Sequence, residues 1–92
     1  MTEQIISPTN EHVDKEELRA AVAATLDIDV AEVTDEAHFV EDLEVDSLMA
    51  LEIAVSLEKK YQVKISEDEL ADVTTLNSTH ALLVELLRKA GR

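Results

Sequence analysis

The chain has no cysteine, no tryptophan, one proline and one glycine, and aromatic residues make up only 2% of its 92 residues. Without cysteine there is neither a disulfide framework nor a thiolate metal site. A single glycine excludes the glycine-rich loops that bind phosphate in nucleotide-binding proteins and the oxyanion loops of hydrolases. A composition of Ala, Leu, Val, Glu and Asp with so few turn residues favours helices over a turn-rich sheet.

Basic residues are also scarce, since 8 Lys and Arg stand against 21 Asp and Glu and leave a net charge of −13. Residues 27–72 hold 15 acidic and 3 basic side chains, so the negative charge belongs to the middle of the chain. Such a surface repels phosphates, and we therefore expect no nucleic-acid or membrane partner and a basic protein surface as the complement. No basic segment followed by an apolar run opens the chain, which predicts a cytoplasmic location.

Ninety-two residues are enough for one small core but not for two. Residues 1–12 lack a sustained period and contain Ser7-Pro8, which predicts a flexible N-terminal tail before a domain over 13–92. Apolar residues at helical spacing predict an all-α fold, a small four-helix bundle of three longer helices and a short third one. The predicted helices cover about residues 14–26, 46–61, 66–72 and 75–89, with capping residues Asp14, Ser66 and Thr75.

The second predicted helix has a broad apolar face, which indicates packing against more than one neighbour. Leu48, Leu51 and Val55 form one stripe of this face, and further apolar residues widen it. The long polar connection over residues 27–46 is predicted to be functional or to hold a short helical turn around residues 35–39. Residues 62–65 alternate like a strand without a pairing partner, so we interpret them as an extended linker with Val63 and Ile65 docked inward.

Histidines and carboxylates form no catalytic or metal-binding pattern. His12, His38 and His80 are spread through the chain without the close spacing of a zinc site. The acidic run of residues 27–38 matches a calcium loop only in charge, because Glu32 stands where the loop needs glycine and His38 where it needs a bidentate glutamate. The sequence therefore predicts neither a metal site nor an enzyme.

Ser47 is the most informative residue, because the stretch EDLEVDSLMALE (residues 41–52) places five carboxylates around it and then leads into a helix. No G-x-S-x-G elbow surrounds it, so a hydrolytic nucleophile is not indicated. Asp46-Ser47 is a common way to cap a helix, and Ser47 is thus either a capping residue or a group that other proteins modify. A helix N-terminus stabilises a phosphate by roughly 0.3–1 kcal/mol, so a phosphodiester on Ser47 is compatible with this position.

Asp42-Leu43, Asp46-Ser47-Leu48 and Glu52 resemble the signature D-L-G-x-D-S-L of carrier proteins. The resemblance extends over about residues 14–90, because a long first loop, a helix that opens at the serine, a short third helix and a final helix follow in the same order. The chain is thus identified as a member of the acyl carrier protein family. The run DSLMALE is most similar to discrete carriers of polyketide pathways.

This resemblance implies a function and a set of partners. A phosphopantetheinyl transferase would move 4′-phosphopantetheine from coenzyme A onto Ser47, and acyl groups would be held as thioesters on that arm. The resemblance implies delivery to acyltransferase, ketosynthase or acyl-ligase type enzymes with basic docking patches, in polyketide or related secondary-metabolite biosynthesis, by a monomer. The implied docking residues are Glu44, Asp46, Leu48, Met49, Glu52 and Glu58.

Three positions depart from the family pattern. Glu44 replaces the usual glycine of a turn, Met49 stands where fatty-acid carriers commonly have an acid, and Lys59 replaces a frequent acid. Each of Leu48, Met49 and Val55 either faces a partner or belongs to the core. The alternatives are a carrier of fatty-acid or aminoacyl groups, and an acidic adaptor of the same fold that binds basic partners without an arm.

Overall fold

The computed structural model describes residues 13–90, all of whose regular elements are helices. They are α1 (Lys15–Leu26), the 3₁₀ helix η1 (Val30–Glu32), α2 (Phe39–Leu43), α3 (Ser47–Tyr61), α4 (Glu67–Leu70) and α5 (Leu76–Lys89). The predicted bundle of three longer helices with a short helix between the last two is confirmed. The predicted tail, residues 1–12, lies outside the described residues.

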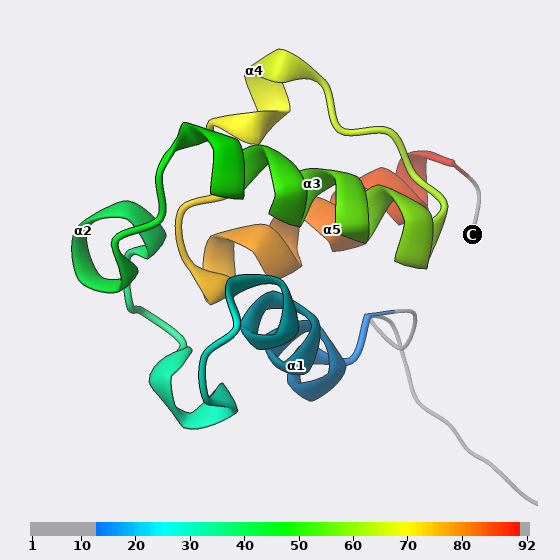
Figure 1. Ribbon diagram of the computed structural model, residues 1–92. Helices are drawn as coiled ribbons and strands as arrows, with labels where there is room; N and C mark the ends of the chain where they lie inside the picture. Colours follow the sequence, from blue (N-terminus) through cyan, green and yellow to red (C-terminus); the bar gives the residue numbers. More distant parts are fainter. Residues whose placement is uncertain (1–12, 91–92) are drawn as a thin grey trace, which may run out of the picture.

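Figure 1 shows α1 below α3 and α5, with α4 on the other side of α3 at the top of the view. α1 packs against both α3 and α5, and each long helix contributes one buried stripe. α1 supplies Leu18, Val22, Ala23 and Leu26; α3 supplies Ile53, Ala54 and Leu57; α5 supplies Leu76, Leu82, Leu83 and Leu87. The spacing of these residues by three and four is what places them on one side of each helix.

The predicted helix caps are confirmed. The carboxylate of Asp14 accepts hydrogen bonds from the backbone N–H groups of residues 16 and 17 at the start of α1. Ser66 and Glu69 form a reciprocal capping box at α4, and Thr75 accepts from the N–H of Ser78 at α5. Because the first N–H groups of a helix lack acceptors within the helix, these side chains define where each helix begins.

The long connection after α1 contains two short helices, η1 and α2. The predicted helical turn around residues 35–39 is wrong in position, because α2 begins only at Phe39. Nδ1 of His38 accepts a hydrogen bond from the N–H of Glu41 at 3.3 Å, and the carboxylate of Asp42 accepts from the N–H of His38 at 2.7 Å. Histidine is an uncommon capping residue, so the sequence offered no clear signal for this start.

The structure decides between the two roles left open for the apolar stripe of the second helix, since the stripe is not part of the core. Leu48, Leu51 and Val55 are 64, 50 and 41% exposed, whereas Ile53 and Leu57 are buried. The predicted linker after α3 is confirmed, because no regular element covers residues 63–66 and both Val63 and Ile65 pack partly buried against the core. α3 therefore has an apolar side that the fold does not cover.

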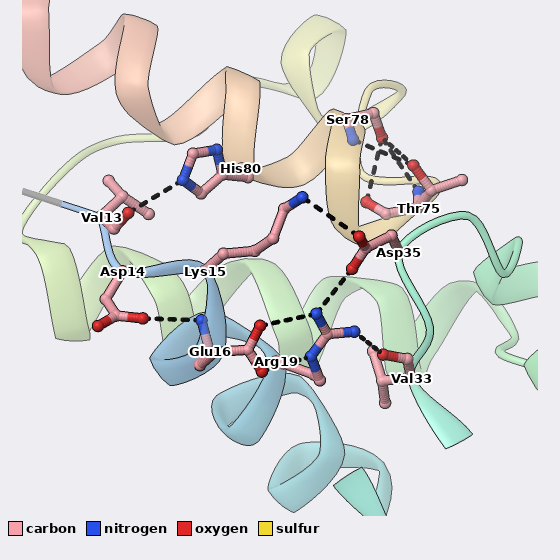
Figure 2. A network of polar contacts seen from close by, with 10 residues as sticks. All are labelled: Val13, Asp14, Lys15, Glu16, Arg19, Val33, Asp35, Thr75, Ser78 and His80. Carbon is pink, nitrogen blue, oxygen red and sulfur yellow. Dashed lines mark hydrogen bonds and ion pairs between the residues drawn. The ribbon is translucent and has the colours of Figure 1, made fainter. Parts of the chain in front are cut away.

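Arg19 of α1 connects the long connection to the bundle, as Figure 2 shows. Its guanidinium donates to the carbonyl of Val33, pairs with Glu16 at 2.9 Å and pairs with Asp35 at 2.7 Å. Lys15 reaches the same Asp35 carboxylate at 3.5 Å, and the Asp35 carbonyl accepts from the N–H of Asn77 at 3.1 Å. Asp35 thereby joins the connection to α1 and to the start of α5, a role that the sequence did not reveal.

The hydrogen bond from Arg19, and the nearby Lys15 charge, hold the pKa of Asp35 below its ordinary value of 3.8. A carboxylate with a lowered folded pKa stabilises the fold above its unfolded pKa, and that contribution is lost as the pH falls through the folded pKa. We expect Asp35→Asn to lower the unfolding free energy near neutral pH. In this variant the unfolding free energy should also fall less steeply as the pH drops below about 4. Denaturant titrations across this pH range measure the effect, and Glu36→Gln, which removes an exposed neighbouring charge, should leave the decline unchanged.

Candidate functional site

Ser47 is the first residue of α3 and is exposed. The preceding residue, Asp46, is the N-cap, and its carboxylate accepts from the N–H of Met49 at 2.9 Å. Within residues 13–90 the Ser47 hydroxyl makes no hydrogen bond. Of the two roles weighed for Asp46-Ser47, capping thus belongs to Asp46, and Ser47 presents a hydroxyl beside the N–H groups of a helix N-terminus.

The corner before Ser47 is held by buried side chains and backbone hydrogen bonds. Phe39 and Val45, at the two ends of the corner, are buried, and the N–H of Val45 donates to the Phe39 carbonyl at 2.9 Å. The N–H of Phe39 donates in turn to the carbonyl of Thr74 at 2.7 Å, ahead of α5. The exposed Ser47 therefore follows a corner that is anchored to the segment preceding α5.

Glu44 ends α2 in the left-handed conformation, with φ 58° and ψ 37°. This conformation costs a residue with a Cβ roughly 1–2 kcal/mol, and glycine adopts it without that cost. The glycine of the resembling signature falls at this position, so the backbone here has the shape that glycine suits even though the residue is glutamate. Asp27 and Gln62 end α1 and α3 with the same φ of 58°.

We expect Glu44→Gly to raise the unfolding free energy by about 0.5–1 kcal/mol, since relief of the left-handed conformation exceeds the added flexibility of the unfolded chain. Thermal and denaturant unfolding measure this. Asp27→Gly, at another exposed helix end with the same φ, should give a change of similar size. A loss of stability at Glu44 alone would show that its side chain makes a compensating contact.

An exposed apolar face lies beside Ser47. It comprises Val40 of α2 and three residues of α3, Leu48, Leu51 and Val55. Glu52 lies among them on α3 and, with Leu51 and Val55, lines an open groove of about 390 Å³. A patch of large apolar side chains with acidic neighbours marks a protein interaction site more often than a solvated face. The breadth of the apolar pattern was the available signal for Leu51 and Val55, neither of which is among the predicted docking residues.

The predicted docking residues fall into two groups. Glu44, Asp46, Leu48 and Glu52 are exposed around Ser47. Met49 is partly buried against the core, and Glu58 accepts a hydrogen bond from the N–H of Ile65 at 2.7 Å, eleven residues along the chain from Ser47. Glu58 thus has a structural partner that the sequence did not indicate.

The two described histidines have other partners than Ser47. Nε2 of His80 donates to the carbonyl of Val13 at 2.9 Å, which Figure 2 shows, and Nδ1 of His38 caps α2. His12 lies outside the described residues. Across residues 13–90 no three potential metal ligands come together, and none of the helices described there is long and apolar enough to cross a membrane.

Comparisons with known proteins show the family to which the chain belongs. The family model for the phosphopantetheine attachment site matches residues 16–83. The chain is 58% identical over 79 residues to polyketide-8 synthase acyl carrier protein 2 of Streptomyces avermitilis, across 86% of this chain and 91% of that protein. It is 40% identical over 78 residues to the meromycolate extension acyl carrier protein of Mycobacterium tuberculosis, across 80% and 68% of the two chains. For the protein of that name from Mycolicibacterium smegmatis the identity is 41% over 76 residues, which cover 78% of this chain and 77% of that protein.

Proposed function

Because the chain belongs to the acyl carrier protein family, whose cofactor is phosphopantetheine, we propose that Ser47 bears the arm and that acyl intermediates of a polyketide pathway travel on it. The chain is a carrier and not a catalyst. The observation that supports Ser47 is its exposed hydroxyl, which takes no part in the hydrogen bonds recorded within residues 13–90.

The surroundings of Ser47 fit a phosphodiester. The hydroxyl precedes the N–H groups of the first turn of α3, and the positive end of the helix dipole favours a phosphate there by roughly 0.3–1 kcal/mol. Asp46 keeps α3 starting at the same residue, so the attachment point stays exposed. The bound arm would supply the thiol that this cysteine-free chain lacks.

Polyketide intermediates are favoured over other kinds of acyl cargo, because the chain is 58% identical to a carrier named for a polyketide synthase. Carriers named for meromycolate extension are similar at a lower level, about 40%, which keeps a fatty-acid type of cargo as the second candidate. The proposed partners are enzymes of the acyltransferase, ketosynthase or acyl-ligase type. The chain is proposed to act as a monomer in the cytoplasm.

Partner enzymes would dock on the face formed by α2 and the first half of α3. Exposed carboxylates of Glu44 and Glu52 meet basic side chains, and Leu48, Leu51 and Val55 provide apolar contact. Single exposed ion pairs contribute little to affinity, but the combined negative field accelerates encounter with a basic partner. The first proposed user of this face is a phosphopantetheinyl transferase.

The loading test incubates the purified chain with coenzyme A and a promiscuous phosphopantetheinyl transferase. Intact-mass spectrometry should show a gain of one phosphopantetheine unit, and fragmentation should place it on the peptide that contains Ser47. No gain in mass would contradict the carrier proposal and favour the acidic adaptor that works without an arm. A gain on another serine would contradict only the assignment to Ser47.

We expect Glu52→Lys to slow loading by about 2- to 30-fold at low ionic strength, since one exposed attraction of roughly 0.2–1 kcal/mol is replaced by a repulsion of similar size. The difference from wild type should shrink as salt is added. Initial loading rates at several salt concentrations measure this. Glu36→Lys makes the same change of net charge on an exposed residue outside the proposed docking face. An equal slowing in both variants would show that net charge alone is responsible.

A further inference from the structure

Most basic side chains of the described residues are concentrated at one end of the molecule. We call residues 58–65 and 85–90 the basic end; it holds five basic and two acidic side chains. The remaining described residues hold two basic and seventeen acidic side chains. Those two bases, Lys15 and Arg19, are both paired with Asp35. The bases of the basic end are Lys59, Lys60, Lys64, Arg88 and Lys89.

An open groove of about 540 Å³ lies at the basic end, where the C-terminal turns of α3 and α5 meet. Its apolar lining comes from Val63, Leu86 and Ala90, and its basic side chains are Lys64 and Lys89. Figure 1 shows these two helix ends together at the right of the view. Both lysines are exposed, whereas Val63 and Leu86 are partly buried, so charge stands at the rim above an apolar floor.

The acidic groups near the groove reduce its positive charge but do not cancel it. Glu58 also lines the groove, so the lining holds two positive charges and one negative charge; the Glu58 carboxylate accepts a hydrogen bond from the N–H of Ile65 at 2.7 Å. Glu85 pairs with Arg88 at 3.3 Å, and Arg88 does not line the groove. The Lys89 charge acts on Glu69 of α4, whose pKa is held below its ordinary value first by its backbone hydrogen bond to Ser66 and least by Lys89. No ion pair of Lys64 or Lys89 is recorded among the described residues.

We propose that this groove is a second docking surface, and that its occupant is an acidic peptide segment of a partner protein with leucine-like side chains between its carboxylates. The carboxylates would meet Lys64 and Lys89, and the apolar side chains would cover Val63 and Leu86. The surface is complementary in charge to such a segment, and it is opposite in charge to the face around Ser47. The proposal does not depend on the attachment of an arm.

The position of the groove allows simultaneous docking. Ser47 and Tyr61 are the two ends of α3, and a rise of 1.5 Å per residue separates them by about 20 Å. A basic enzyme at the Ser47 end and an acidic segment at the basic end would therefore occupy different parts of α3. The acidic segment would hold the carrier near a partner while Ser47 remains accessible, which raises the effective concentration of the carrier at that partner.

The test uses the full chain with two synthetic acetylated peptides, EELLEELL and its charge-reversed form KKLLKKLL, followed by amide NMR at low ionic strength. EELLEELL should shift the amides of residues 62–65 and 86–90, and KKLLKKLL should shift those of α2 and the first half of α3. The chain repels an acidic peptide through its net charge, so its binding requires a local basic site. Absence of shifts with EELLEELL at millimolar concentration, or shifts elsewhere, would overturn the proposal.

Paired variants separate the groove from net charge. Lys64→Gln with Lys89→Gln removes the two rim charges and should weaken binding of EELLEELL by about three- to tenfold, as expected for two exposed ion pairs. Lys59→Gln with Arg88→Gln removes two charges from the same helix ends, outside the lining of this groove. This pair should weaken the binding of EELLEELL by less than about twofold. Equal weakening in both pairs would show that charge alone attracts the peptide. The Lys64 and Lys89 pair includes no residue of the proposed docking face, whereas Lys59 lines the groove beside Leu51, Glu52 and Val55.

Discussion

Replacing Ser47 with alanine is expected to abolish the gain in mass on incubation with coenzyme A and a phosphopantetheinyl transferase. The substitution removes the only atom at that position able to form the phosphodiester. The fold should survive, because within residues 13–90 the hydroxyl has no hydrogen-bond partner and alanine suits a helix well. We expect the unfolding free energy to change by less than about 0.5 kcal/mol. Intact-mass spectrometry and denaturant unfolding on the same sample measure both results.

Two control variants separate attachment from folding. Ser56→Ala removes a hydroxyl from the same helix, two turns or more beyond Ser47, and should load fully. Asp46→Ala removes the N-cap of α3 and should cost about 1 kcal/mol of stability while leaving the attachment hydroxyl in place. If Ser47→Ala unfolds the chain, the hydroxyl has a structural role that the described hydrogen bonds do not contain. If it still gains mass, the arm is attached elsewhere.

Replacing Phe39 with alanine is expected to lower the unfolding free energy by about 3–5 kcal/mol. Phe39 is 1% exposed and is the only phenylalanine in the chain. Loss of its ring leaves a cavity below the corner between α2 and α3, where its backbone also joins Val45 and Thr74. Domains of this size are commonly stable by only 5–15 kcal/mol, so the loss should lower the melting temperature markedly. Because the corner carries Ser47, loading should slow as well.

The neighbouring residue provides the control. Val40 is 54% exposed, and Val40→Ala should change the unfolding free energy by less than about 0.5 kcal/mol. Thermal melts followed by circular dichroism compare the two variants. Loading of Phe39→Ala should recover in stabilising osmolytes if the defect is one of folding. A melt of Phe39→Ala equal to that of wild type would show that the ring does not hold the corner together.

The helix order and three of the caps could be predicted from the sequence, because they depend on local physics. The apolar spacing of α1 and α5 and the side chains of Asp14, Ser66 and Thr75 act over a few residues. The stretch around Ser47 is equally local, since a serine after a capping aspartate at the start of a helix is visible in the sequence. This is why the predicted bundle is confirmed by the structure, whereas Ser47 as the attachment residue stays a prediction.

Which side of α3 is exposed could not be decided from the sequence, because the helix is apolar on more faces than the bundle covers. Leu48, Leu51 and Val55 have the spacing of a core stripe, and only the placement of α1 and α5 decides that Ile53 and Leu57 are buried instead. Helical periodicity identifies apolar faces, but it does not identify which of two apolar faces meets a neighbour.

The sequence by itself determined that this chain is an acidic helical bundle with Ser47 at a helix start, because spacing, capping and charge are properties of neighbouring residues. Only the tertiary structure decided which side chains have partners far along the chain. Asp35 pairs with Arg19 sixteen residues away, Glu58 binds the N–H of Ile65, and α3 and α5 bring Lys64 and Lys89 to one groove. Such contacts arise when helices pack, and packing places together residues whose separation along the chain carries no signal.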